Sequence, residues 1–393
     1  MLAGVLTALA LIPEVISFSV IAGVDPQVSL IASVVLCLAM SVFGGRPAMV
    51  TAAAGSVALV IGPMVHQHGV GYILPAVILA GIIQILFGLC GMARLMRFIP
   101  PAVMTGFVNA LGILIFFAQV PHFWNRQPLI VGLFVLTLLI VLWAPRVIKA
   151  IPAPLIAIVA LTLYTATTGQ QLPTVGDEGS MSGGLPGFTA LTVPLNLTTL
   201  QIIWPCALSI AFVGLMESLL TAKLVDDLTH TPSNKSRESA GLGIANILAG
   251  CYGGIAGCYG GIAGCAMIGQ TIVNVEMGRA RSRLSTVIAG LVLLLLVTAL
   301  SQVMAKIPMA VLAGVMVIVA VKTFSWHSIR PGELARNPWP ETLVMLVTVA
   351  ATVGTSNLAI GVLAGIVAMA IIPRRLRAKA QATSETASPD PEK

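Results

Sequence analysis

The chain has 393 residues, of which 57% are hydrophobic and only 9% are charged, and its mean hydropathy is +0.99. A soluble domain usually carries about 25% charged residues, so this composition excludes a chain that covers its whole surface with charge. We expect an all-α polytopic membrane protein. The apolar segments are too long for the strands of a β-barrel and do not alternate polar with apolar residues.

Apolar runs of about 17–25 residues, the length of a helix that spans a bilayer, recur along the chain. Breaks at glycine, proline and charged residues divide them into 14 predicted segments. The third and tenth are too short to cross a bilayer as helices. In chain order the segments cover residues 3–22, 28–44, 49–62, 72–93, 103–120, 128–144, 152–167, 200–222, 239–250, 266–276, 284–304, 308–323, 341–354 and 358–373.

The basic residues predict the orientation of these segments. With the N-terminus in the cytoplasm, alternation leaves only Arg126 and Lys306 outside and places 19 of the 21 basic residues inside. A wrong count of spans would distribute the basic residues over both sides of the membrane, because each missed span inverts the orientation of all that follow. The net charge of +7 then belongs to the cytoplasmic rim and needs no nucleic acid. The residues placed inside are Arg46, Arg94, Arg97, Arg146, Lys149, Lys223, Lys235, Arg237, Arg279, Arg281, Arg283, Lys322, Arg330, Arg336, Arg374, Arg375, Arg377, Lys379 and Lys393.

The longest stretch outside the predicted segments divides the chain into two halves of seven. It runs from about Gly169 to Thr198 and is rich in Gly, Pro and Thr. An odd number of spans per half makes the second half inverted relative to the first, as in many transporters. The predicted organisation is a first repeat at 1–167, an extracellular linker at 168–199, a second repeat at 200–376 and a disordered cytoplasmic tail at 377–393.

The third segment of each half has the same interrupted pattern. Gly44–Pro63 and Gly260–Val275 both contain a Gly-Gly pair, then Ala-Met, then a short run of small residues. This pattern predicts an extended lead-in and a half-helix that starts in mid-membrane. Free backbone N–H groups at such a start attract anions. A plain re-entrant loop, or glycines that only allow close helix packing, is the alternative.

Two acids fall well inside predicted spans, Glu14 and Glu217. An ionisable group at that depth is costly and functional by default. Glu217 and Thr221 share one helix face, and a carboxylate with a hydroxyl suits a proton or Na⁺. The two acids occupy the first helix of each half. A structural hydrogen bond for Glu217, and partial exposure for Glu14, are the alternatives.

Neither cysteine nor histidine forms a metal-site pattern. Cys37, Cys90 and Cys206 lie in apolar segments and are interpreted as small core residues. Cys251, Cys258 and Cys265 are spaced by seven because CYGGIAG is written twice in tandem, at 251–257 and 258–264. A zinc site needs closer pairs and usually histidine. We expect no metal and no cofactor.

Four stretches of the chain resemble the SulP, or sulfate permease, family of anion transporters. They are LIPEVISFSVIAGVDP, FGGRPAMVTAAAG, GLMESLLTAKLVDDLTHTPSNKSRESAGLGIANILAG and GGIAGCAMIGQTIVNVEMGRARSRLS. The resemblance covers nearly the whole chain in order. It implies a 7+7 inverted repeat with a core (spans 1–4 and 8–11), a gate (spans 5–7 and 12–14), elevator-like movement and a homodimer.

The resemblance also implies site residues. The substrate position after the first-helix proline falls on Glu14, with its aromatic residue at Phe18. The coupling-ion acid falls on Glu217, supported by Thr221. The starts of the two half-helices fall on Ala54, Gly55 and Ser56, and on Ile268, Gly269, Gln270 and Thr271.

The chain departs from the family pattern at four places. Many relatives carry Arg where this chain has Gln270. The absence of this positive charge makes the anion more dependent on backbone N–H groups here. Some Na⁺-coupled bicarbonate transporters have Asp in place of Glu217, so Glu favours protons. Relatives usually carry a STAS domain after the last span and a cytoplasmic lead-in before the first, and neither is evident here. The duplication looks like an in-frame insertion. We expect its second copy to keep the lead-in role and its first copy to bulge outwards.

These features favour a secondary transporter of a small oxyanion in the cell (inner) membrane, with both termini cytoplasmic. Sulfate is the leading substrate and H⁺ the leading coupling ion. The alternatives are Na⁺-coupled bicarbonate transport, a nucleobase carrier of the same architecture, and an uncoupled anion channel or exchanger. No arrangement of nucleophile and base or metal cluster supports a membrane enzyme.

Overall fold

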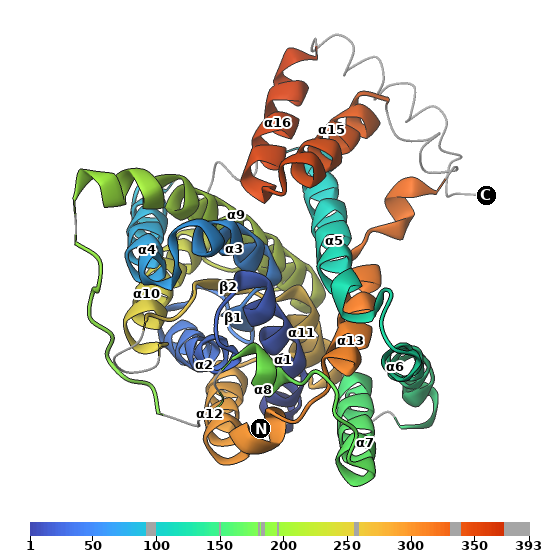
Figure 1. Cartoon of the computed structure of the whole chain (residues 1–393). Helices are drawn as coiled ribbons and strands as arrows, with labels where there is room; N and C mark the ends of the chain where they lie inside the picture. Colours follow the sequence, from blue (N-terminus) through green and yellow to red (C-terminus); the bar gives the residue numbers. More distant parts are fainter. Residues whose placement is uncertain are drawn as a thin grey trace. The chain divides into compact units, whose positions relative to one another are not determined.

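The computed structural model describes residues 1–91, 100–148, 151–179, 181, 185–194, 196–254, 259–330 and 339–372. These residues are mostly helical, as expected, and the exception is a pair of three-residue strands (Figure 1). The predicted disordered tail at 377–393 lies outside the described residues. So do Cys258 and nine of the basic residues used for the orientation, namely Arg94, Arg97, Lys149, Arg336, Arg374, Arg375, Arg377, Lys379 and Lys393.

The first half contains one helix for each predicted span, with a short strand before the third. Proline stands at the start of α2 and of α6, where its missing N–H has no helical partner to lose. The elements are α1 (Leu2–Ala22), α2 (Pro26–Phe43), β1 (Thr51–Ala53), α3 (Gly55–His68), η1 (Val70–Tyr72), α4 (Ile73–Leu89), α5 (Pro101–Phe123), α6 (Pro128–Val147) and α7 (Ala153–Thr168). A single turn, α8 (Val175–Glu178), follows in the linker.

The second half repeats this order of elements and confirms the 7+7 arrangement. Its tenth span is shorter than the matching third span and ends in a π-helical turn, η3 (Val273–Met277), which the sequence analysis did not anticipate. The elements are α9 (Leu197–Thr229), α10 (Lys235–Tyr252), β2 (Gly264–Ala266), α11 (Ile268–Ile272), η3, α12 (Leu284–Met304), α13 (Met309–Thr323), η4 (Trp326–Ile329), α15 (Trp339–Thr355) and α16 (Leu358–Ile371).

Helix length and composition agree with a multi-pass membrane protein. Within the described part of the chain, seven helical segments are long and apolar enough to cross a bilayer. They begin at Leu2, Pro26, Val70, Pro101, Pro128, Leu197 and Leu284. Four further apolar helices, α7, α13, α15 and α16, are 14–17 residues long.

The chain forms two compact units. One contains residues 1–96 and 119–318, and the other contains residues 97–118 and 319–393. The core and gate that the family resemblance implies follow different boundaries, so that division stays a prediction.

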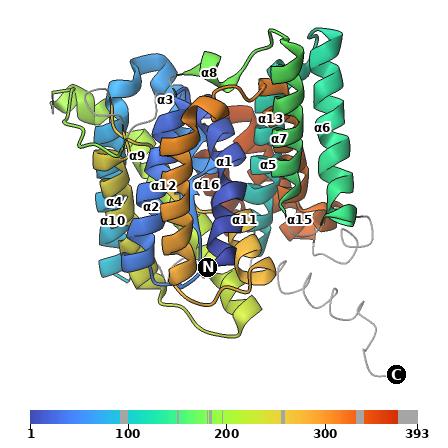
Figure 2. The ribbon, with the colours of Figure 1, turned by 90° about the horizontal axis from the view of Figure 1, so that it is seen from below.

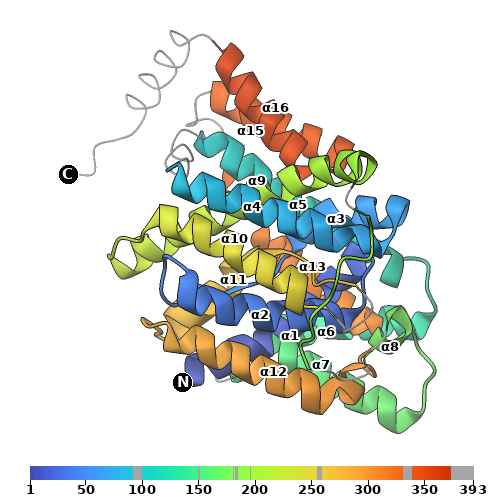
Figure 3. The same ribbon diagram turned by 90° about the vertical axis from the view of Figure 1, so that its left-hand side faces the viewer.

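In the larger unit, α4, α10, α2 and α12 lie side by side in that order (Figure 3), and Figure 2 shows α2 directly beside α12. Small residues allow the close approach of α4 and α10. A Cβ atom added to Gly81 would lie 2.7 Å from the carbonyl oxygen of Gly243. Such small-residue contacts replace the hydrophobic driving force that is missing between helices in lipid. The strands β1 and β2 lie among α1, α2, α3 and α11 (Figure 1).

The smaller unit contains α15, α16 and the first part of α5. Gly106 of α5 faces Thr348 of α15, and a Cβ atom at this glycine would lie 2.7 Å from the Cβ of Thr348. Asn109, which is buried, donates to Ser328 Oγ at 2.9 Å and accepts the N–H of Ser325 at 2.8 Å. These polar contacts tie α5 to the segment that follows α13.

Candidate functional site

The two strands bring the starts of the two half-helices together. β1 and β2 are antiparallel, with Thr51 opposite Ala266 and Ala53 opposite Gly264. Helix α3 begins two residues after β1, and α11 begins two residues after β2. The antiparallel register therefore sends the two helices away from the ladder in opposite directions, with their N-terminal ends towards it. This is the arrangement that the interrupted segments predicted.

A two-stranded ribbon inside a membrane unit must satisfy its outer backbone groups with side chains. On the β1 side, Ser33 Oγ accepts the N–H of Ala53 at 3.0 Å. On the β2 side, Ser218 Oγ accepts the N–H of Ala266 at 3.0 Å, and Asn246 Oδ1 accepts the N–H of Gly264 at 2.9 Å. Helices α2, α9 and α10 thus fix the ribbon, and with it the helix starts.

The start of α3 is covered by an aromatic ring. Ala54 is extended (φ −116°, ψ 150°) and provides no side-chain cap to the helix. A Cβ atom on Gly55 would lie 2.6 Å from Cε1 of Phe18, and Phe18 itself is buried. The predicted aromatic residue and the predicted helix start are therefore in direct contact, and Gly55 is the residue that permits it.

Glu217 of α9 reaches the same place. Its carboxylate Oε2 accepts hydrogen bonds from the hydroxyl of Ser56, in the first turn of α3, and from the thiol of Cys265 in β2 at 3.0 Å. The Ser56 and Cys265 side chains are 3.5 Å apart. Glu217 is 8% exposed, and Ser56 and Cys265 are 1% and 0% exposed. One carboxylate thus joins α9, the first half-helix and the second strand.

Two hydroxyls in the predicted site bond to backbone. Thr221 Oγ1 donates to the carbonyl oxygen of Glu217 at 2.7 Å, not to its carboxylate. Thr271 Oγ1 accepts the N–H of Val50, just before β1, at 3.0 Å. Thr271 therefore ties the second half-helix to the first lead-in. An ion-binding role for Thr221 stays a prediction.

The start of α11 is more open than that of α3. Ile268 is half-buried, Gly269 is exposed, and a Cβ atom on Gly269 would meet no atom within 4 Å. Gln270 is buried, and its Nε2 lies 3.4 Å from the carbonyl oxygen of Ala10 in α1. Among the described residues, its Oε1 has no hydrogen-bond partner.

Glu14 lies on α1, one turn before Phe18, and is half-buried. Since Phe18 covers the start of α3, residues of α1 and α3 share one region of the larger unit. The structure thus brings Phe18, Gly55, Ser56 and Glu217 into one group, while Glu14 lies one turn before Phe18 on α1 and Gln270 of α11 contacts α1 at Ala10.

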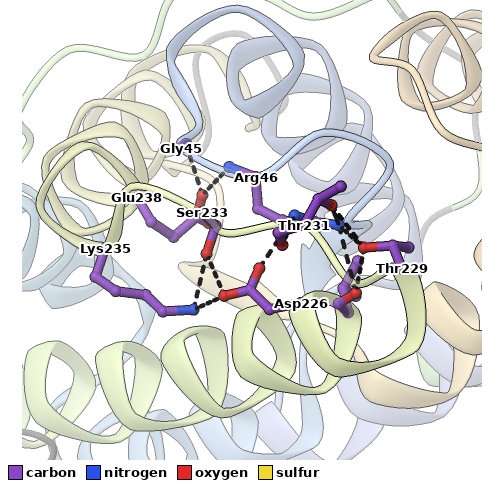
Figure 4. A network of polar contacts seen from close by, with 9 residues as sticks. Gly45, Arg46, Asp226, Thr229, Thr231, Ser233, Lys235 and Glu238 are labelled. Carbon is purple, nitrogen blue, oxygen red and sulfur yellow. Dashed lines mark hydrogen bonds and ion pairs between the residues drawn. The ribbon is translucent and has the colours of Figure 1, made fainter.

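A second polar cluster lies at the end of α9 that is predicted to face the cytoplasm (Figure 4). The guanidinium of Arg46, on the lead-in to β1, pairs with Asp226 at 3.1 Å and donates to the carbonyl oxygen of Thr231 at 2.8 Å. Asp226 also pairs with Lys235 at 2.6 Å. Glu238 is fully buried and accepts the N–H groups of Gly45 and Arg46 at 2.7 and 3.0 Å.

This cluster was missed in the sequence analysis, which placed Arg46 and Lys235 only as rim charges. The cluster fastens the first lead-in to the α9–α10 connection. Gly45 and Arg46 precede the other members, which include Thr229 and Ser233, by about 180–190 residues in the sequence. The only signal in the sequence was the mixed charge of the segment after α9.

The duplicated segment is divided between two roles. In its first copy, Cys251 and Tyr252 form the last residues of α10. The Cys251 carbonyl oxygen accepts the N–H of Thr189 in the linker at 2.8 Å. In its second copy, residues 260–263 are buried and lead into β2, which begins at Gly264. The second copy therefore supplies the lead-in, and residues 255–257 of the first copy, which was expected to bulge outwards, lie outside the described residues.

The chain matches the Sulfate permease family model over residues 1–127 and 120–331. It is 48% identical over 374 residues to the putative sulfate transporter YbaR of Bacillus subtilis (strain 168), covering 94% of this chain and 75% of that protein. It is 26% identical over 359 residues to the bicarbonate transporter BicA of Picosynechococcus sp., covering 83% of this chain and 62% of that protein. The solved transmembrane domain of a cyanobacterial BicA has a TM-score of 0.79 at 25% identity, covering 93% of this chain and 96% of that one.

Proposed function

Since the chain belongs to the sulfate permease family of membrane anion transporters, we propose that it carries a small inorganic oxyanion by proton-coupled symport, with sulfate as the leading substrate. Sulfate comes first because the relative with 48% identity is named a putative sulfate transporter. The family consists of transporters and not of enzymes.

The observation that carries the proposal is the position of Glu217. Its carboxylate bonds to Ser56 in the first turn of α3 and to Cys265 in β2. The N-terminal end of α3 is suited to an anion by its free N–H groups and dipole. A charged carboxylate beside that end would oppose an incoming anion, and a protonated one would not. Binding of the proton and of the anion are then mutually favourable, as symport requires.

Substrate contacts follow from the same geometry. We assign the anion to the region between the starts of α3 and α11, formed by Ala54, Gly55 and Ser56 and by Ile268, Gly269, Gln270 and Thr271. Phe18 and Glu14 border this region from α1. The exposed Gly269 offers a place where an anion reaches backbone N–H groups. An elevator-like movement and a homodimer complete the proposal and follow from the family resemblance.

Na⁺-coupled bicarbonate transport is the second candidate, because BicA resembles this chain in sequence and in fold. Na⁺, like other hard cations, favours oxygen ligands. Glu217 here receives one hydroxyl and one thiol, and the Thr221 hydroxyl turns to a backbone carbonyl. This donor set favours a proton. An uncoupled channel or exchanger is the third candidate, in which Glu217 would be dispensable.

Uptake of labelled sulfate into proteoliposomes tests the proposal. An imposed inward proton gradient should drive concentrative uptake, and an inward Na⁺ gradient at equal pH should not. Labelled bicarbonate under the same two gradients provides the comparison. Bicarbonate uptake that follows Na⁺, without sulfate uptake, would replace the proposal with the second candidate.

A further inference from the structure

Cys265 lies at the centre of the candidate coupling site. It is the middle residue of β2, and its Sγ is 3.0 Å from Glu217 Oε2 and 3.5 Å from Ser56 Oγ. In the sequence, its position follows only from the seven-residue spacing of the duplication. In the structure it is fully buried and makes its polar contact with the one carboxylate proposed to carry the coupled proton.

Both neighbours of Cys265 in the strand are held in place. The N–H of Gly264 donates to Asn246 Oδ1 at 2.9 Å, and the N–H of Ala266 donates to Ser218 Oγ at 3.0 Å. Ser218 directly follows Glu217 in α9. Because successive side chains of a strand point to opposite faces, these anchors fix the direction of the Cα–Cβ bond of Cys265. The fully buried thiol reaches the carboxylate from this fixed backbone position.

The contact has a chemical consequence. A hydrogen bond donated to a carboxylate stabilises its charged form and opposes protonation. Here two donors, the Ser56 hydroxyl and the Cys265 thiol, share the same oxygen atom of Glu217. A thiol is a weaker donor than a hydroxyl, so cysteine at this position opposes protonation less than serine would and more than alanine would.

We propose that Cys265 is a positioning residue for Glu217, and that its thiol sets the pH range in which this carboxylate takes up and releases its proton. The inference rests on the proposed function, since it takes Glu217 as the coupling acid. It adds a residue and a form of regulation that neither the motifs nor the relatives assign.

Glu14 lies on α1, one turn before Phe18, and in the described part of the chain the other charged groups near α9 lie towards the ends of the helices that carry them. On the elements packed against α9, the titratable side chains are His66 and His68 at the far end of α3, and Lys235, Arg237, Glu238, Cys251 and Tyr252 at the two ends of α10. Helices α4 and α11 have none. On α9 itself, Cys206 bonds to the Val60 carbonyl oxygen, and Lys223, Asp226 and Asp227 lie in its last turns.

Infrared spectroscopy of the full chain in lipid vesicles tests the inference without requiring transport. The C=O band of protonated Glu217 is identified by its absence in Glu217→Gln, and its loss with rising pH gives a midpoint. We expect Cys265→Ala to raise this midpoint by about 0.5–1 pH unit, because a donor to the carboxylate is lost. Cys265→Ser should lower it, and Cys206→Ala, the matched cysteine control, should leave it unchanged.

Equal midpoints in the parent, Cys265→Ala and Cys265→Ser would overturn the inference, as would shifts of both variants in the same direction. If Cys265→Ala does not fold, the comparison of Cys265→Ser with the parent still decides. Sulfate uptake measured in the same vesicles separates the two proposals. If the infrared midpoints follow the expected order, Cys265→Ser below the parent and Cys265→Ala above it, but sulfate uptake does not depend on pH, then the role of Cys265 stands and proton coupling is refuted.

Discussion

The ring of Phe18 in α1 lies directly against Gly55, the first residue of α3, so closely that a Cβ atom at this glycine would be 2.6 Å from Cε1 of the ring. This contact closes one side of the first half-helix start, where Ser56 and Glu217 meet. The first helix of the chain therefore shapes the region proposed to bind the anion.

Gly55→Val should displace the Phe18 ring or the start of α3, because real Cβ atoms are not found so close to ring carbons. We expect at least a tenfold loss of sulfate uptake and a lower melting temperature. The measurements are uptake into proteoliposomes and thermal unfolding of the purified protein at a fixed scan rate.

Gly269→Ala provides the control for this substitution. Gly269 is the second residue of α11, in the first turn of the second half-helix, but its added Cβ atom would meet nothing within 4 Å. Its melting temperature should equal that of the parent. Equal melting temperatures for Gly55→Val and the parent would refute the claim that Phe18 constrains this position.

Arg46→Ala should destabilise the larger unit. The substitution leaves Asp226 with Lys235 as its remaining cation and removes the donor to the Thr231 carbonyl oxygen. Breaking a buried ion pair costs about 3 kcal/mol, which thermal unfolding would report as a clear fall in melting temperature. Lys223→Ala, at an exposed lysine of α9, the helix that carries Asp226, should change the melting temperature little. An unchanged value for Arg46→Ala would show that the cluster does not hold the lead-in.

Gln270→Glu should impair anion binding more than folding. The residue is buried beside α1 in the second half-helix, and a carboxylate there would repel an anion at the proposed site. We expect the KM for sulfate to rise about tenfold or more, equivalent to at least 1.4 kcal/mol. Gln270→Met, which adds no charge, should keep a KM much closer to that of the parent. Equal KM values for both variants would show that the anion does not bind near α11.

Deleting residues 251–257 should preserve uptake, because the remaining copy of CYGGIAG still supplies the buried lead-in to β2. The deletion removes one of the two tyrosines of the duplicated segment, and in the structure each of them makes its own contact. Tyr252 packs against Phe188 of the linker, and Tyr259 donates to Asp25 Oδ2 at 2.8 Å. We expect sulfate uptake equal to or above that of the parent. A clear loss of uptake would show that the first copy has acquired a necessary role.

The positions of the helices could be predicted from the sequence because lipid sets the length of apolar runs. Each of the 14 predicted segments corresponds to a helix or a strand–helix pair in the described chain. The interrupted segments could also be recognised, since Gly-Gly followed by Ala-Met occurs in both halves. Among the site residues, Gly55 lies against Phe18 and Ser56 donates to Glu217, while the roles that the resemblance implies for them stay predictions.

Contacts between distant side chains could not be predicted in this way. Glu238 accepts N–H groups more than 190 residues earlier in the chain, and no local pattern encodes such a partner. Cys265 was interpreted through the duplication because its proximity to Glu217 exists only after β2 has docked on α9. Likewise, a shared helix face suggested that Thr221 would meet the Glu217 side chain, but its hydroxyl bonds to the backbone carbonyl one turn earlier.

The most direct test of proton coupling is the proton flux that accompanies sulfate. A pH-sensitive dye trapped in proteoliposomes would follow the internal pH when an inward sulfate gradient is imposed without a pH gradient. For the parent we predict internal acidification together with sulfate entry, and for Glu217→Gln no sulfate-driven acidification. Sulfate entry with no acidification in the parent, or equal acidification in Glu217→Gln, would contradict the assignment of coupling to Glu217.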